Sequence, residues 1–220
     1  MDSIIEDRIV FTYLMPSINQ RGLMTIDVNL CNTDQDFFDN LDEIIEDTMV
    51  QMFILHPKTI SEIEQTQKIA DEYESIFYSV PLHLQDKADG KCVAFSIVSD
   101  EDSVTMSDKP IVIDEAYLNE TLIDSLGECR GIILNATYEH ENLPNFYLAM
   151  GSRTIGAFDT EVLAQMSMDR IVLQSTYPNH GFEEIMECVK VISNAMFRPE
   201  QSIIARATKS SLELFGFRKS

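Results

Sequence analysis

The stretch Met168-Asp-Arg-Ile-Val-Leu-Gln-Ser-Thr-Tyr-Pro178 joins a short apolar run to polar residues that follow it directly. The apolar run predicts a buried β-strand over residues 170–173, because a strand that is covered on both faces is apolar throughout. Gln174, Ser175 and Thr176 then stand at the carboxyl end of the strand, where α/β folds gather their functional side chains. None of these three side chains is ionisable. The stretch therefore has the pattern of a strand that leads into a site, but it supplies no charged side chain to that site.

Seven further runs of this kind precede the stretch. They predict strands over residues 24–30, 50–55, 76–82, 92–98, 110–113, 131–135 and 153–155. Helical patterns are predicted over residues 34–47, 59–74, 118–128, 142–150, 160–166, 182–196 and 199–215. Eight strands that alternate with helices predict an α/β fold, a TIM-like (β/α)₈ barrel.

Two segments depart from an ideal barrel. Residues 99–109, between the fourth and fifth strands, are polar and too short for a full covering helix, so the barrel is expected to be shortened there. Residues 1–23 form an N-terminal extension whose apolar run, 9–15, is either an added edge strand or a docking segment. The barrel domain itself is predicted to span residues 24–220.

The bulk composition limits the possible functions. A chain of 220 residues with 45% hydrophobic residues can bury one sizeable core without disulfides or metals. It has 16 Lys and Arg against 37 Asp and Glu, and its formal charge of -21 opposes binding to nucleic acid. This acidity fits either solubility, including adaptation to salt, or a basic protein partner.

The cysteines and the apolar runs indicate the compartment. Cys31, Cys92, Cys129 and Cys188 lack C-x-x-C spacing, which is typical of reduced thiols rather than of a disulfide framework or a zinc site. No signal-peptide pattern is present, and no apolar run approaches the ~18 residues that a membrane span requires. We therefore expect a soluble, cytoplasmic protein that does not enter a membrane.

Several segments together resemble the TatD family of metal-dependent deoxyribonucleases, which have amidohydrolase-like barrels. Met24-Thr-Ile-Asp-Val-Asn-Leu-Cys-Asn32 is similar to the family's opening Ile-Asp-x-His-x-His strand. The stretch 168–178 resembles Leu-Asp-Arg-x-Leu-x-Glu-Thr-Asp-x-Pro, and Ala207-Thr-Lys-Ser-Ser-Leu-Glu-Leu-Phe-Gly216 resembles the family's C-terminal motif. The resemblance runs from about Met24 to Phe217 and is carried by framework positions.

The metal ligands that the resemblance implies are replaced in this chain. Asn29 and Cys31 stand in place of the paired histidines of the first strand, and Asp114 and Asn135 in place of those of the fifth and sixth strands. The triplet Gln174-Ser-Thr176 replaces Glu-Thr-Asp and loses both carboxylates. Amides and hydroxyls neither hold a divalent ion firmly nor lower the pKa of its water, so we expect no metal and no other cofactor.

The remaining polar residues are expected to meet at the carboxyl-end mouth of the barrel. By the two-residue period of a strand, Asp27, Asn29 and Cys31 share one face. The predicted degenerate site consists of Asp27, Asn29, Cys31, His83, Asp114, Asn135 and Thr176. It is either a hydrogen-bonded polar plug or a rebuilt site for a small ligand. His83 occupies the position where the family is expected to contact the substrate phosphate.

Two functions remain open from the sequence. The first is a catalytically inactive TatD-like barrel, a pseudoenzyme that acts through binding, as a protein-interaction or scaffold subunit with an unidentified protein partner. The alternative is a metal-dependent hydrolase or deoxyribonuclease with a site rebuilt around Asp27, His83 and Asp114. The loss of most ligand positions favours the first, and measurement of bound metal separates the two.

Overall fold

The structure, a computed structural model, describes residues 25–30, 35–47, 50–99, 102, 104, 107–138, 140, 143–175 and 183–217. The predicted N-terminal extension, residues 1–23, lies outside the described residues. Two predicted site residues, Cys31 and Thr176, also lie outside them.

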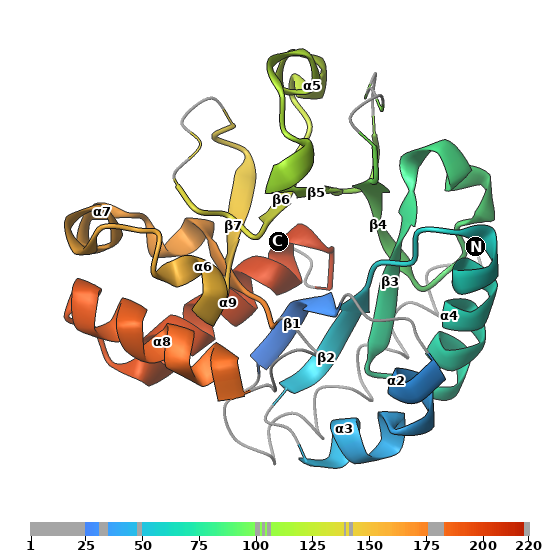
Figure 1. Ribbon diagram of the computed structural model, residues 1–220, viewed down its shortest axis with the longest axis horizontal. Helices are drawn as coiled ribbons and strands as arrows, with labels where there is room; N and C mark the ends of the chain where they lie inside the picture. The colour runs from blue at the N-terminus through green and yellow to red at the C-terminus, as the bar shows by residue number, and fades with distance from the viewer. Residues whose placement is uncertain are drawn as a thin grey trace, which may run out of the picture.

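Eight parallel strands form one sheet in the order of the sequence (Figure 1). They are β1 Thr25–Leu30, β2 Val50–Leu55, β3 Ile76–Pro81, β4 Cys92–Ile97, β5 Ile111–Asp114, β6 Gly131–Leu134, β7 Phe146–Met150 and β8 Ile171–Leu173. The last strand lies beside the first, so the sheet curls into a nearly closed barrel. The predicted α/β fold with a TIM-like (β/α)₈ barrel is therefore confirmed.

The helices lie outside the ring of strands or across one of its ends (Figure 1). They are α2 Gln35–Asp39, α3 Leu41–Asp47, α4 Ile60–Glu72, α5 Glu120–Leu126, α6 Ser152–Ile155, α7 Thr160–Gln165, α8 Glu183–Met196 and α9 Glu200–Leu214. Thr59 and Glu62 form the capping box that starts α4, at the residue where the predicted helix begins. The predicted helix over residues 34–47 is instead two helices that meet at Asn40.

The seventh strand is where the sequence prediction was wrong. Residues 142–150 were predicted to be a helix, but they contain β7, and the predicted strand over residues 153–155 lies within helix α6. Leu, Ala and Met are good helix formers, yet burial on both faces of the sheet overrides that propensity here. Pro144 was the available signal, because a proline inside a helical pattern argues against the helix.

The connection between β4 and β5 is short, as expected. The described residues between Val98 and Pro110 contain no helix. Among the described helices, none is both long enough and apolar enough to cross a bilayer.

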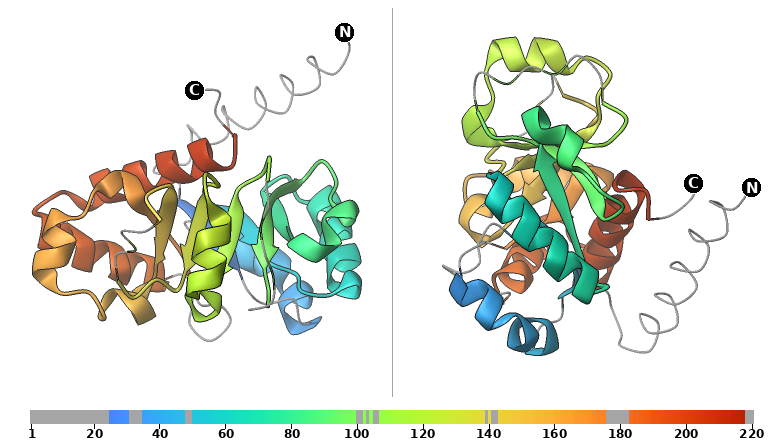
Figure 2. Two further views of the ribbon diagram at one scale, coloured as in Figure 1. Left: turned by 90° about the horizontal axis from the view of Figure 1, so that it is seen from above. Right: turned by 90° about the vertical axis from the view of Figure 1, so that its right-hand side faces the viewer.

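The core has two layers that the strands separate. An outer layer joins the strands to the helices, and an inner layer fills the barrel with side chains such as Ile26, Ile54 and Val172. The end of α9 completes the inner layer through Leu212 and Phe215, which are buried with those residues. Figure 2 shows α9 lying along one end of the barrel. That end therefore has an apolar closure, which leaves the opposite, carboxyl-end mouth as the place for a site.

Candidate functional site

Strand β1 is irregular at the point where it reaches the mouth. Asp27 pairs with Phe53 and Leu30 pairs with Leu55, so three residue steps on β1 match two on β2. Such an extra residue is a β-bulge, and it interrupts the two-residue alternation of side chains. The sequence analysis placed Asp27 and Asn29 on one strand face by a regular two-residue period, and such a period does not include a bulge. The bulge lets the two residues bind consecutive residues, Ser175 and Gln174, after β8.

The carboxylate of Asp27 links β1 to the end of β8. Its Oδ1 accepts hydrogen bonds from the backbone N–H groups of Asn29 and Ser175, both at 3.0 Å, and its Oδ2 accepts one from Ser175 Oγ at 2.5 Å. Asp27 is completely buried. Burial raises the pKa of this carboxyl group, while the bonds from Ser175 and Asn29 act in the opposite direction. Asp27 is thus a structural link across the seam of the barrel.

A chain of amides continues from this link across the mouth. Gln174 Oε1 accepts from Asn29 Nδ2 at 3.4 Å and from the backbone N–H of Asn135 at 3.1 Å, while Gln174 Nε2 donates to Asn135 Oδ1 at 2.8 Å. Asn135 Nδ2 donates to Asp114 Oδ2 at 2.8 Å, and the other oxygen of Asp114 accepts from Ala116 N–H at 3.0 Å. We call Asp27, Asn29, Asp114, Asn135, Gln174 and Ser175 the mouth network. It joins β1, β5, β6 and β8 through complementary donors and acceptors.

His56 is a mouth residue that the sequence analysis did not place in the site. It follows β2 directly and is buried, with Nε2 2.7 Å from the carbonyl oxygen of Val28 and Nδ1 2.8 Å from Ser79 Oγ. A carbonyl only accepts, so Nε2 carries the proton and Nδ1 accepts from the Ser79 hydroxyl. Burial lowers the pKa of His56 to about 4, which leaves it neutral. The signal was its position directly after a buried strand.

A small cavity lies beside the mouth network. Its volume is about 170 Å³, and its lining includes His56, Lys58, Ser96, Asp114 and Tyr117. Typical ligand pockets occupy roughly 300–1,000 Å³, so this space is smaller than a usual substrate site. Among the described residues, the buried Ser96 Oγ has no hydrogen-bond partner.

One predicted site residue, His83, lies apart from the network. His83 is in a 3₁₀ segment, Leu82–Lys87, after β3, and its side chain is 52% exposed. Its Nδ1 lies 3.9 Å from Asp102 Oδ1, across the loop that follows β4. No interaction found among the described residues joins it to Asp27 or Asp114. Positions 31 and 176 are outside the described residues, so the structure brings together four of the seven predicted residues: Asp27, Asn29, Asp114 and Asn135.

The side chains of the described mouth do not suit the coordination of a divalent ion. Both oxygens of Asp27 and both of Asp114 accept from protein donors, and both ring nitrogens of His56 are engaged. Within the described ranges, no three His, Cys, Asp or Glu side chains converge as a metal site would require. The amides of Asn29 and Asn135 hold the positions between these groups. The two carboxylates that are present thus already take part in hydrogen bonds between strands, and neutral amides lie between them.

The fold and the mouth define a class of protein, a TIM-like (β/α)₈ barrel with an amide-rich mouth. The sequence matches no protein-family model and no curated protein. Solved structures, in contrast, are similar over most of the chain. A TatD homologue from Escherichia coli superposes with a TM-score of 0.68 at 12% sequence identity, covering 87% of this chain and 98% of that one.

Two other solved structures support the same fold. A TatD-family hydrolase from Entamoeba histolytica has a TM-score of 0.64 at 9% identity and covers 86% of this chain and 97% of its own. An uncharacterized TIM-barrel protein from Bordetella bronchiseptica has a TM-score of 0.56 at 12% identity, with coverage of 88% and 100%. The predicted resemblance to TatD proteins is therefore confirmed at the level of the fold.

Proposed function

We propose that this protein is a pseudoenzyme: a catalytically inactive TatD-like barrel that acts by binding a protein partner, as a scaffold or interaction subunit in the cytoplasm. The mouth network is the observation that carries the proposal. Hydrolysis by a metal-dependent barrel needs carboxylates and imidazoles free to hold an ion and activate water. In the mouth, the corresponding groups of Asp27, Asp114 and His56 are occupied by structural hydrogen bonds.

The charge of the chain supports the same proposal. A formal charge of -21 repels a polyanionic substrate at long range, and no ion-binding cluster is found in the described residues to offset it. The same charge favours the approach of a basic protein surface, because opposite charges accelerate association.

The catalytic part is tested with single-stranded DNA and added Mg²⁺, Mn²⁺ or Zn²⁺, together with elemental analysis of the purified protein. We expect no cleavage and no stoichiometric tightly bound ion. The control is a double variant, Asp114→Ala with His83→Ala. Metal-dependent cleavage that disappears in this variant, with folding intact, would establish the rebuilt hydrolase and reject the pseudoenzyme.

An exposed aromatic residue supports the binding part of the proposal. Phe197 follows α8 directly and is 92% exposed, and its φ of 51° lies in the left-handed region. The N–H of Arg198 donates to the carbonyl oxygen of Ser193 at 3.1 Å, which is the bond of a Schellman helix end, where glycine is usual. A left-handed residue costs about 1–2 kcal/mol, and here no burial of the ring offsets that cost. A contact with a partner would account for a phenylalanine here.

Phe197→Asn tests this anchor because asparagine tolerates the left-handed region. We expect the free energy of unfolding to rise by about 0.5–1 kcal/mol, while affinity for the partner falls about tenfold or more. The partner is obtained by native co-purification and mass spectrometry, and binding is then measured with the purified pair. Ile60→Asn is the matched control, since Ile60 is 48% exposed on α4 and should leave affinity unchanged. Equal affinity of Phe197→Asn and the parent protein would reject Phe197 as the anchor.

A further inference from the structure

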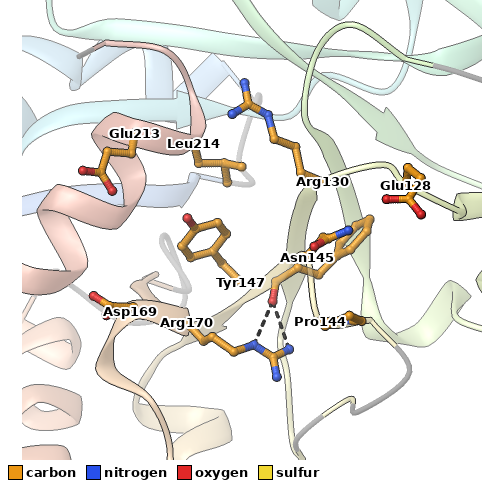
Figure 3. Close-up of a pocket in the computed structure, with 10 residues that line it drawn as sticks. Glu128, Arg130, Pro144, Asn145, Tyr147, Asp169, Arg170, Glu213 and Leu214 are labelled. Atoms are coloured by element: carbon orange, nitrogen blue, oxygen red, sulfur yellow. Dashed lines mark hydrogen bonds between the residues drawn. The ribbon is translucent and has the colours of Figure 1, made fainter. Parts of the chain in front are cut away.

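A second, larger hollow lies at the opposite end of the barrel from the mouth network. Its volume is about 670 Å³, within the range of small-molecule sites. Arg130 directly precedes β6, Asn145 directly precedes β7, and Arg170 directly precedes β8, so the hollow opens at the amino ends of these strands. The end of α9 supplies Glu213 and Leu214 as the facing wall (Figure 3). We call this space the lower hollow.

Most charges around the lower hollow are already compensated. Asp169 forms an ion pair with Arg206 through both of its oxygens, and this pairing lowers the pKa of Asp169. Glu213 lies 3.4 Å from Lys209, one helical turn earlier on α9. The guanidinium of Arg170 donates to the backbone carbonyl oxygens of Phe146 and Leu143, and so it fastens the chain before β7. These groups therefore already have partners within the protein.

Arg130 differs from these groups. In the part of the chain that the structure describes, no hydrogen bond or ion pair of its guanidinium is found. The strand register explains its direction: Ile132 pairs with Tyr147, both belong to the inner layer, and Arg130 is two residues before Ile132 on the same face. Figure 3 shows Arg130 and Tyr147 extending into the same space, with Glu128 on the far side of the Arg130 backbone.

Tyr147 supplies a second polar group beside an apolar surface. Burial and the nearby Glu213 carboxylate raise the pKa of the Tyr147 hydroxyl, so it stays protonated and can donate. The ring itself, with Leu214 and Pro144, offers apolar contact. A guanidinium fork and a phenol O–H are the donors that suit a carboxylate or phosphate oxygen.

We propose that the lower hollow binds a small organic anion, with a carboxylate or phosphate group on Arg130 and Tyr147 and an apolar body against Tyr147 and Leu214. The proposal does not depend on the pseudoenzyme assignment, because it uses residues at the other end of the barrel. The net acidity of the protein does not prevent it, since screening confines charge repulsion to about 10 Å at ordinary salt.

The experiment is titration of the full chain with benzoate and with phenyl phosphate, followed by calorimetry and by the arginine Nε–Hε signals in nitrogen–proton NMR spectra. Benzyl alcohol is the uncharged control ligand. We expect at least one of the two anions to bind and benzyl alcohol not to bind. The anion with the higher affinity distinguishes a carboxylate site from a phosphate site. The shifting NMR signal should be the one that Arg130→Gln removes.

Three variants separate a site from general charge effects. Arg130→Gln should weaken binding about tenfold or more, and Tyr147→Phe about threefold, because the hydrogen bond to a charged donor is the stronger one. Arg153→Gln removes an equal charge from an exposed position on α6 and should change affinity less than about twofold. Failure of both anions to bind at millimolar concentration, or equal binding by Arg130→Gln, would overturn the proposal.

Discussion

The two ends of the barrel are closed by different interactions. At the carboxyl end, the mouth network closes the gap with hydrogen bonds between buried polar side chains, Asp27 and Gln174 being its centres. At the amino end, Leu212 and Phe215 of α9 close the interior with apolar contacts. Among the described residues, a cavity of about 170 Å³ lies beside the mouth network, and a hollow of about 670 Å³ lies at the rim of the amino end.

If both proposals made above hold, this difference reverses the usual roles of the two ends of a (β/α)₈ barrel. The carboxyl end normally carries the chemistry, and the amino end normally serves stability. Here the polar groups of the mouth network pair with one another, while Arg130 and Tyr147 at the amino end are directed into open space. Binding at one end of the barrel would therefore leave the fold at the other undisturbed.

The largest expected effect comes from close packing at the amino end. A Cβ on Gly131 would overlap the carbonyl oxygen of Ile111 and lie 2.6 Å from Phe146 Cε1. Gly131→Ala should lower the free energy of unfolding by about 4 kcal/mol or more, or prevent folding, because backbone must move. Urea unfolding measures this. Gly156→Ala is the control, since nothing lies within 4 Å of its Cβ, and a loss below about 1 kcal/mol for Gly131→Ala would refute the packing argument.

The next effect tests the hydrogen-bonded end. Asp27→Ala removes an acceptor that serves three buried donors of Asn29 and Ser175. It should lower the free energy of unfolding by about 2–4 kcal/mol. Asp86→Ala, at a side chain that is 71% exposed, should be nearly neutral in the same denaturation assay. Equal stability of the two variants would mean that the mouth network does not hold the seam.

The smallest effect concerns acid sensitivity of the mouth. His56 has a pKa of about 4 in the folded protein against 6.5 as the ordinary value, so the unfolded chain binds a proton first as pH falls. The stability that neutral His56 provides is complete above 6.5 and is lost as pH falls towards 4. At about pH 5 this loss amounts to about 2 kcal/mol.

Unfolding curves at neutral and acid pH test the assignment. His56→Gln should remove this part of the pH dependence, whereas His83→Gln, at a half-exposed residue, should retain it. A His56→Gln protein as acid-sensitive as the parent would place the effect in other groups.

Several features of the site were predictable from sequence because they follow from strand ends. Asp114 and Asn135 end or follow apolar runs, and parallel strands bring such positions to one edge. The sequence also placed Gln174 at the carboxyl end of a strand, but it did not predict the hydrogen bonds that Gln174 makes to Asn29 and Asn135. His56 was missed as a site residue because its two partners, Val28 and Ser79, come from neighbouring strands.

The sequence by itself indicated the fold class and the positions of seven of the eight strands, because apolar runs are local information. It misplaced β7, since Phe146–Met150 has helix-forming residues whose burial only the assembled sheet decides. The bulge in β1 and the direction of Arg130 into the lower hollow were decided only by tertiary structure. Both depend on which residues of separate strands lie opposite one another, and that register is fixed by packing of the whole barrel.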